Sequence, residues 1–405
     1  MKFSKQARLA TILGFVCSFA YMNVYFVRSV LSIVTPDMLD SGYSTEYIGL
    51  VSTVFMITYG VGQLLNGMIG DRIKAKHMIC LGLFAAALSN ITFVIVEKDV
   101  VQCISYGICG FAMSMIYAPV TKIIAENVSL KYATRAILGV TFAAFIASPL
   151  AGIAAIILNW RPMFVLGSLL LMLSCVMCFV VIKHLERNYG ISYIIGSNKT
   201  KGNGEGCVRT LLKKEIARYT CVSAITGVIR TSVIFWIPTF FVQYLGYESS
   251  TSAVLYSFVT IVISVAPYAT VWCHSKIFRR DMHKAVLIYF LLGAVCFFLM
   301  CIVKVAIINV FLVTAALLFG NMASSVLWNI YCPSLQDTGY ISTATGYLDF
   351  MSYAGGAAAN ILFANAVDKI GWLSLLIVWG VIMLVGTPTG FSVKHLDKSS
   401  ICRCD

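Results

Sequence analysis

Twelve apolar stretches of about 20 residues divide this chain, and they constrain its fold more than any other feature. A stretch of that length crosses the hydrocarbon core of a bilayer as an α-helix. Because no water there can satisfy backbone groups, a spanning segment must be a helix or part of a closed barrel. The alternating pattern of a membrane barrel does not occur in these stretches, and only 12% of the residues are charged. The sequence therefore predicts an all-α membrane protein with 12 transmembrane helices.

Two short segments at matched positions each place an arginine inside an apolar stretch. The first, YFVRSVLSIVTP at 25–36, contains Arg28, and the second, VIRTSVIFWIP at 228–238, contains Arg230, 202 residues further on. In both, a hydroxyl residue follows the arginine directly and a proline follows it eight residues later. Lys74 and Lys276, in two cationic turns, are separated by the same 202 residues. We interpret this spacing as an internal duplication, which predicts two pseudo-symmetric six-helix bundles with a site between them.

One long polar connection separates the two halves. Residues 183–215 are polar, basic and glycine-containing, which is typical of a flexible linker. They divide the chain into an N-terminal bundle at 1–182 and a C-terminal bundle at 216–405 that ends in a short basic tail. Of the 30 Lys and Arg residues, 23 lie near the termini or in the even-numbered connections. This asymmetry predicts a multi-pass protein of the cell (inner or plasma) membrane with both termini in the cytoplasm.

Charge and motif content argue against several other function classes. The net charge of +13 would suit a nucleic-acid partner, but membrane orientation already explains where these cations lie. The GNGEG segment of the linker lacks the Gly-Lys-Ser/Thr that completes a phosphate-binding loop. All five histidines lie in connections or at helix ends, and neither H-E-x-x-H nor G-x-S-x-G occurs. We therefore expect no enzyme activity, no nucleic-acid partner, no metal and no cofactor.

Three cations and one acid fall inside the predicted helices: Arg28, Lys122, Arg230 and Asp349. A charged side chain at the bilayer centre costs about 2.5–3.5 kcal/mol on insertion scales, so such residues usually mark a functional site. Arginine presents a planar fork of donors that can bind a phosphate or carboxylate through two parallel hydrogen bonds. We expect Arg28 and Arg230, one from each half, to bind a shared small anion.

Less specific interpretations of the same residues stay open. Arg28 and Arg230 could form structural ion pairs or extend toward the interface, although one acid cannot pair with two arginines and a lysine. Lys122 could extend the anion site or reach the cytoplasm. Asp349 could neutralise an arginine in the empty site, carry a coupling proton, or contact substrate hydroxyls. Four further residues could line the cavity or serve only in packing: Tyr25, Gln63, Trp236 and Asn321.

The segment GQLLNGMIGDRIKAKHM at 62–78 resembles the signature between spans 2 and 3 of the major facilitator superfamily, and the resemblance covers essentially the whole chain. The signature has an aspartate-arginine pair, here Asp71 and Arg72, followed by basic residues such as Lys74. In that superfamily it is linked to gating. The resemblance therefore implies the major facilitator fold and a gating role for these three residues, with an ordinary solvated turn as the alternative.

Shorter motifs resemble the organophosphate:phosphate antiporters, which include glycerol-3-phosphate and hexose-phosphate transporters. They are YFVR at 25–28, PVTK at 119–122, RTSVIFWIPT at 230–239, SYAGG at 352–356 and DKIGW at 368–372. In that family two arginines bind the phosphate, and these correspond to Arg28 and Arg230. Gln63 stands where family members often have lysine, and no histidine lies near Ile146, where the glycerol-phosphate branch has one.

The resemblance implies a secondary transporter that exchanges a sugar phosphate or glycerol phosphate for inorganic phosphate by alternating access, and we expect it to function as a monomer. Two other functions stay open. One is a proton-coupled symporter of a sugar acid or other carboxylate, with Asp349 as the titrating group. The other is a transporter-like sensor of sugar phosphates, which the short linker and tail disfavour because they hold no added domain.

Overall fold

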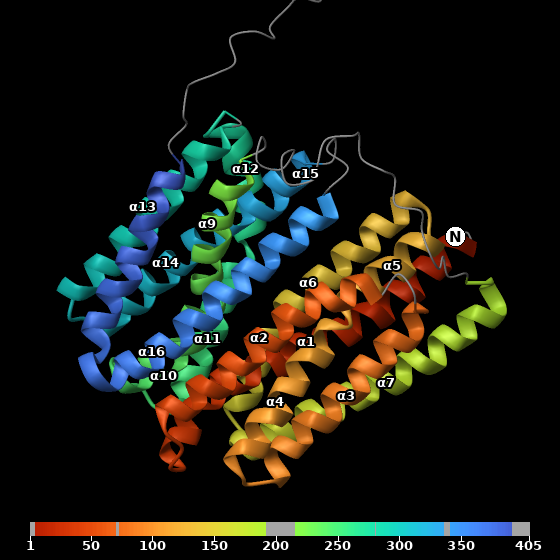
Figure 1. Ribbon diagram of the computed structural model, residues 1–405, viewed down its shortest axis with the longest axis horizontal. Coiled ribbons are helices and arrows are strands. Elements are labelled where there is room, and N and C mark those ends of the chain that lie inside the picture. The colour runs from red at the N-terminus through yellow and green to blue at the C-terminus, as the bar shows by residue number, and fades with distance from the viewer. Residues whose placement is uncertain (1–4, 70–72, 192–214, 280, 336–340, 391–405) are drawn as a thin grey trace, which may run out of the picture.

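A computed structural model of the chain describes residues 5–69, 73–191, 215–279, 281–335 and 341–390. These residues are helical apart from short connections, which confirms the all-α prediction. Figure 1 shows the helices of the first half, in red to yellow-green, beside those of the second half, in green to blue. In this described part, 11 helical segments are long and apolar enough to cross a membrane.

The first half forms one packed group of helices around α1. Its elements are α1 (Lys5–Asp40), α2 (Thr45–Ile69), α3 (Ala75–Ile95), α4 (Asp99–Ser114), α5 (Tyr117–Asn127), α6 (Leu130–Ala155) and α7 (Trp160–Tyr189). Helix α1 packs against α6 and α7, α2 packs against α4, and α3 packs against α4 and α7. Because α1 is covered on several sides, most of its residues are buried, from Leu9 to Met38.

The second half contains the same kind of group, with two π-helical turns. Its elements are α9 (Ile216–Gly227), η1 (Val228–Val233), α10 (Ile234–Gln243), α11 (Ser249–Ser264), α12 (Ala266–Lys276), α13 (Met282–Ile302), α14 (Ala306–Val326), η2 (Leu327–Tyr331), α15 (Cys332–Ser334), α16 (Ile341–Gly386) and η4 (Thr387–Gly390). The turns η1 and η2 are π-helical. Helix α16 is two helices joined at Gly371, whose φ of +74° is a conformation that favours glycine.

Several helix ends differ from the ends expected from hydropathy. Hydropathy places the first apolar stretch at 9–33, but α1 continues through Pro36 to Asp40. The sixth was expected to end at 182, but α7 continues to Tyr189, so the first residues of the expected linker are helical. The remainder of that linker, 192–214, lies outside the described residues. Hydropathy marks where the apolar surface ends, whereas a helix can extend into the aqueous phase as long as its backbone remains bonded.

Prolines account for the interruptions within spans. A proline has no backbone N–H, and its ring clashes with the carbonyl four residues before it. The fourth apolar stretch, which hydropathy places at 100–124, is broken between α4 and α5, shortly before Pro119. Both π-helical turns also come just before a proline, η1 before Pro238 and η2 before Pro333. Such turns commonly accompany a local kink.

The two halves meet mainly through α2 with α16 and α6 with α11. Hydrogen bonds cross this boundary: Ser32 Oγ donates to Phe235 O at 2.6 Å, and Ser257 Oγ donates to Pro149 O at 3.2 Å. Gly152 lets α6 approach α11 closely, since a Cβ there would lie 2.8 Å from the carbonyl oxygen of Ala253. These contacts hold one defined arrangement of the two halves.

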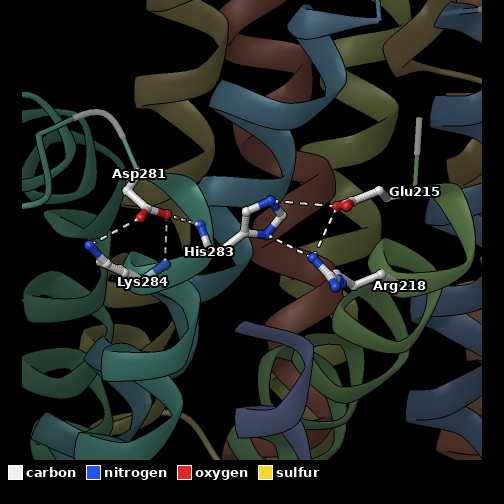
Figure 2. A network of polar contacts seen from close by, with 5 residues as sticks. All are labelled: Glu215, Arg218, Asp281, His283 and Lys284. Carbon is white, nitrogen blue, oxygen red and sulfur yellow. Dashed lines mark hydrogen bonds and ion pairs between the residues drawn. The ribbon is translucent and has the colours of Figure 1, made fainter. Parts of the chain in front are cut away.

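A network of polar contacts fixes the start of α9 against α13 (Figure 2). Arg218 Nη1 donates to Glu215 Oε2 at 3.1 Å and lies 3.3 Å from His283 Nδ1, while His283 Nε2 lies 3.5 Å from that glutamate oxygen. Asp281 caps α13 by accepting from the backbone N–H groups of His283 and Lys284, each at 3.1 Å. Burial alone would raise the pKa of Asp281, but the hydrogen bonds from Lys284 and His283 and the Lys284 charge outweigh it and hold that pKa below its usual value.

A candidate anion site between the two halves

A cavity of about 230 Å³ lies between the two halves of the chain. Its walls come from α1, α2, α4 and α6 of the first half and from η1, α10, α11 and α14 of the second. Four of the residues proposed from the sequence line it: Tyr25, Arg28, Arg230 and Asn321. The two arginines that lie 202 residues apart in the sequence therefore share one cavity.

Arg28 is held by three tyrosines. Its Nη2 donates to the hydroxyl of Tyr353 at 2.9 Å. Its Cζ lies 5.3, 4.8 and 5.3 Å from the ring centroids of Tyr25, Tyr59 and Tyr353, a cation–π arrangement that partly offsets the cost of burying the charge. Tyr353 belongs to α16, so this contact joins the halves. In the described part of the chain, no carboxylate forms an ion pair with Arg28.

Arg230 lies on the π-helical turn η1 and is partly buried. A π-helical turn adds one residue to the helical repeat and so redirects the side chains that it carries, which is why such turns are frequent at functional sites. Within the described ranges, no hydrogen bond or ion pair engages the Arg230 guanidinium. An arginine that faces a cavity inside a membrane protein without a bound carboxylate is suited to an anionic ligand.

Four hydroxyl groups that line the cavity donate their protons to backbone carbonyls. The Oγ atoms of Ser29, Ser32 and Thr260 donate to backbone carbonyls at 3.0, 2.6 and 3.0 Å. Thr231 does the same at 2.7 Å. Because each hydroxyl has one proton, these groups keep only lone pairs for a ligand. The cavity therefore combines two cationic forks with acceptors that suit a ligand bearing O–H or N–H groups.

Asp349 is not one of the residues that line this cavity. It is partly buried on α16, one turn before Tyr353, and lies within electrostatic range of Arg230 and Arg28. No hydrogen bond or ion pair to its carboxylate occurs among the residues that the structure describes. The Asp349 carboxyl group therefore interacts with the two arginines through space, without a direct bond to either.

The structure places three other proposed residues outside the cavity lining. Lys122 forms an ion pair with Glu126 on α5 at 3.9 Å. Gln63 Nε2 donates to the hydroxyl of Tyr59 at 2.9 Å, so it can position the tyrosine that contacts the first arginine. Trp236 is fully buried, which fits the packing alternative.

The proposed gating residues are described only in part. Asp71 and Arg72 lie outside the described residues, and Lys74 is exposed just before α3 begins. Their gating role therefore stays a prediction from the resemblance.

Sequence reasoning missed Tyr59 and Tyr353 as site residues. Tyr59 precedes Gln63 by four residues, and Tyr353 follows Asp349 by four. Residues four apart share a face of a helix. The signal was therefore present, because each tyrosine stands one turn from a residue that the sequence had already singled out.

Comparison with known proteins agrees with this architecture. The family model described as Major Facilitator Superfamily matches residues 17–360. A bacterial homologue of the human lysosomal transporter Spinster, solved in an inward-facing and unoccupied conformation, superposes with a TM-score of 0.74 at 12% identity, over 96% of this chain and 97% of that one. The structural likeness concerns the fold alone, and it bears out the predicted major facilitator fold.

Three sequence relatives have more specific names. The glycerol-3-phosphate transporter of Bacillus subtilis (strain 168) is 22% identical over 95% of this chain and 90% of its own length. The hexuronate transporter of the same organism is 22% identical over 92% of this chain and 94% of its own length. The membrane sensor protein UhpC of Salmonella typhimurium is 39% identical, but only over 18% of this chain and 17% of its own length.

Proposed function

This chain belongs to the major facilitator superfamily. From that premise we propose that it transports a small organic anion, and that this anion is an organophosphate exchanged for inorganic phosphate. Its superfamily makes it a multi-pass membrane transporter of small solutes and not an enzyme. The organophosphate and the exchange are the proposed part. Both termini are proposed to lie in the cytoplasm, from the distribution of Lys and Arg.

One observation carries the proposal. Arg28 from the first half and Arg230 from the second line the same cavity, and in the described residues neither is paired with a carboxylate. Two such cations are costly in a membrane protein unless a ligand supplies negative charge. A phosphate offers several oxygens and can accept paired hydrogen bonds from both guanidinium groups. A glycerol or sugar body would then place its hydroxyl protons toward the acceptors on Ser29 and Thr260.

Exchange follows from the position of the two charges in different halves. An anion that bridges them offsets their repulsion, which lets the halves rearrange together around the loaded site. The empty site brings together two cations with no bridging anion, and this opposes the same rearrangement. We therefore expect slow movement of the empty carrier and fast exchange of anions.

Two alternatives have an observation in their favour. A carboxylate also binds arginine in a bidentate manner, and the full-length likeness to a hexuronate transporter supports a sugar acid as substrate, with Asp349 as the coupling group. The local likeness to a membrane sensor supports a sensing function. The alignment with the glycerol-3-phosphate transporter covers 95% of this chain and that with the sensor 18%, which favours transport over sensing.

Counterflow of labelled phosphate in proteoliposomes tests the proposal. Efflux that requires an external organophosphate or phosphate supports exchange, uptake only with a pH gradient supports the symporter, and no flux with retained binding supports the sensor.

Arg230→Lys keeps the charge but loses the planar fork, so we expect at least about a tenfold loss of affinity, equal to 1.4 kcal/mol. Arg161→Lys, at an exposed arginine in the first turn of α7, is the matched control. Unchanged affinity in Arg230→Lys would contradict bidentate capture.

A further inference from the structure

The carboxylate of Asp349 is the one strong negative group near the two arginines in the described part of the chain. The titratable or charged groups within its electrostatic range come from six elements: Arg28 (α1), Tyr59 (α2), Tyr117 (α5), Arg230 (η1), Cys332 (α15) and Tyr353 (α16). Tyrosine and cysteine are ordinarily neutral at pH 7. Asp349 and the residues around it therefore contain two formal positive charges, on the arginines, and one formal negative charge, on the carboxylate.

We propose that Asp349 makes the site select a singly charged anion over a doubly charged one. This inference rests on the proposed anion site and specifies the charge state of its ligand. With Asp349 ionised, the net charge of the group is +1, and a monoanion brings it to zero. A dianion leaves one negative charge in surroundings of low dielectric constant, where an unbalanced charge is costly.

The geometry explains how Asp349 can act without touching the ligand. It lies one turn from Tyr353, which binds Arg28 directly, and it forms no ion pair with either arginine in the described ranges. It therefore does not remove a guanidinium from the site, as a salt bridge would. Its charge lowers the favourable potential that both guanidinium groups produce, and the loss of binding energy is proportional to the charge of the ligand.

A proton balance follows for phosphate monoesters. Their second pKa is about 6, so the dianion predominates at neutral pH. To give a neutral loaded site, the dianion must enter with one proton, which resides either on a phosphate oxygen or on an Asp349 oxygen. In both cases the complex holds one proton more than the free ester and the free, ionised site. Binding of a phosphate monoester should therefore strengthen as the pH falls from 8 toward 6.

Anions with fixed charge test the inference. Methyl sulfate carries one negative charge and sulfate carries two between pH 5.5 and 8, so calorimetric titration of the purified full chain separates charge from protonation. In Asp349→Asn we expect methyl sulfate to bind about tenfold more tightly and sulfate about a hundredfold more tightly, because the removed repulsion doubles with the charge. The tighter binding of methyl phosphate at low pH should also disappear in this variant.

Three further variants make the result decisive. Asp349→Glu keeps the charge and should keep the parent preference. Asp40→Asn removes one negative charge at the exposed end of α1 and should leave both affinities unchanged. Suppose that Arg230→Ala weakens the binding of both sulfate and methyl sulfate. If Asp349→Asn then changes the two affinities by the same factor, or changes neither, the inference is overturned while the anion site stands. If Arg230→Ala weakens neither, the anion site itself is wrong and the inference falls with it.

Discussion

The hydrogen bond between Arg28 and Tyr353 joins the two halves at a single pair of residues. Guanidinium has five N–H donors, so donating one of them to the Tyr353 hydroxyl leaves four for a ligand. The ring of the same tyrosine lies 4.8 Å from that of Tyr59 on α2. Tyr353 thus fixes the direction of the fork and also packs against the opposite half.

Tyr353→Phe removes the hydroxyl and keeps the ring. A hydrogen bond to a charged group contributes about 1.5–3 kcal/mol, and its loss lets Arg28 leave the orientation that faces the cavity. We expect affinity for inorganic phosphate to fall by about tenfold, measured by calorimetry on the purified protein. Tyr47→Phe, which removes a hydroxyl bonded to Gln102 away from the cavity, should have no effect. Unchanged or tighter binding in Tyr353→Phe would show that the hydroxyl does not orient Arg28.

At the scale of elements, the site depends on how closely α9 approaches α16. A Cβ at Gly355 would lie 2.6 Å from the carbonyl oxygen of Ala224, and a Cβ at Gly227 would overlap the backbone of Ser352. Since the obstacles are backbone atoms, a side chain at either glycine requires the helices to separate. Helix α9 leads directly into η1 and Arg230, while α16 carries Tyr353. The two glycines therefore determine how the two arginines are presented.

Gly355→Ala should separate these helices. Overpacking of a closely packed contact usually costs about 1–3 kcal/mol, which we expect to appear as a melting temperature lowered by several degrees in detergent and as weaker phosphate binding. Gly139→Ala is the matched control. Gly139 lies within α6, and a Cβ there would lie 3.5 Å from Ser18 Oγ of α1, an ordinary van der Waals distance. Alanine also favours the helix over glycine. A Gly355→Ala protein as stable as the parent would mean that this approach is not limited by the glycine.

The sequence was a good guide to which segments are helical and to the two arginines, and a poor guide to the shape of the helices. The bilayer thickness sets the length of the apolar stretches, and the internal duplication sets the 202-residue spacing of the arginines. Both features can be read directly from the amino-acid sequence. The π-helical turn under Arg230 and the break before Pro119 depend on backbone geometry, which hydropathy does not report. Tyr59 and Tyr353 each stand one turn from a residue that the sequence singled out, but they belong to two other helices, and their meeting around Arg28 depends on packing that the sequence pattern does not report.

At the scale of the whole molecule, the contacts between halves indicate which parts must move. Gly152 of α6 and Ser257 of α11 touch across the boundary, and Ser32, four residues beyond Arg28 toward the end of α1, bonds to Phe235. Within the first half, Gly14 and Ala136 make an equally close contact between α1 and α6. If transport proceeds by rearrangement of two rigid halves, contacts of the first kind must break and contacts of the second kind must persist.

Paired cysteines can distinguish these two kinds of contact. A Cβ at Gly152 would lie 3.3 Å from Ser257 Cβ, and a Cβ at Gly14 would lie 3.1 Å from Ala136 Cβ, both near the separation of bridged cysteines, about 3.5–4.5 Å. We expect oxidised Gly152→Cys/Ser257→Cys to lose phosphate counterflow by at least about tenfold and to recover it on reduction, because alternating access requires this contact to open.

The pair inside the first half supplies the matching control. Oxidised Gly14→Cys/Ala136→Cys should retain counterflow, since its bridge joins helices that move together. The four single variants and the oxidised parent measure any contribution from the native cysteines, of which Cys221 is the exposed one among those described. Full counterflow through a protein shown to be bridged between 152 and 257 would mean that α6 and α11 need not separate, and the transport cycle would then have to move elements within each half.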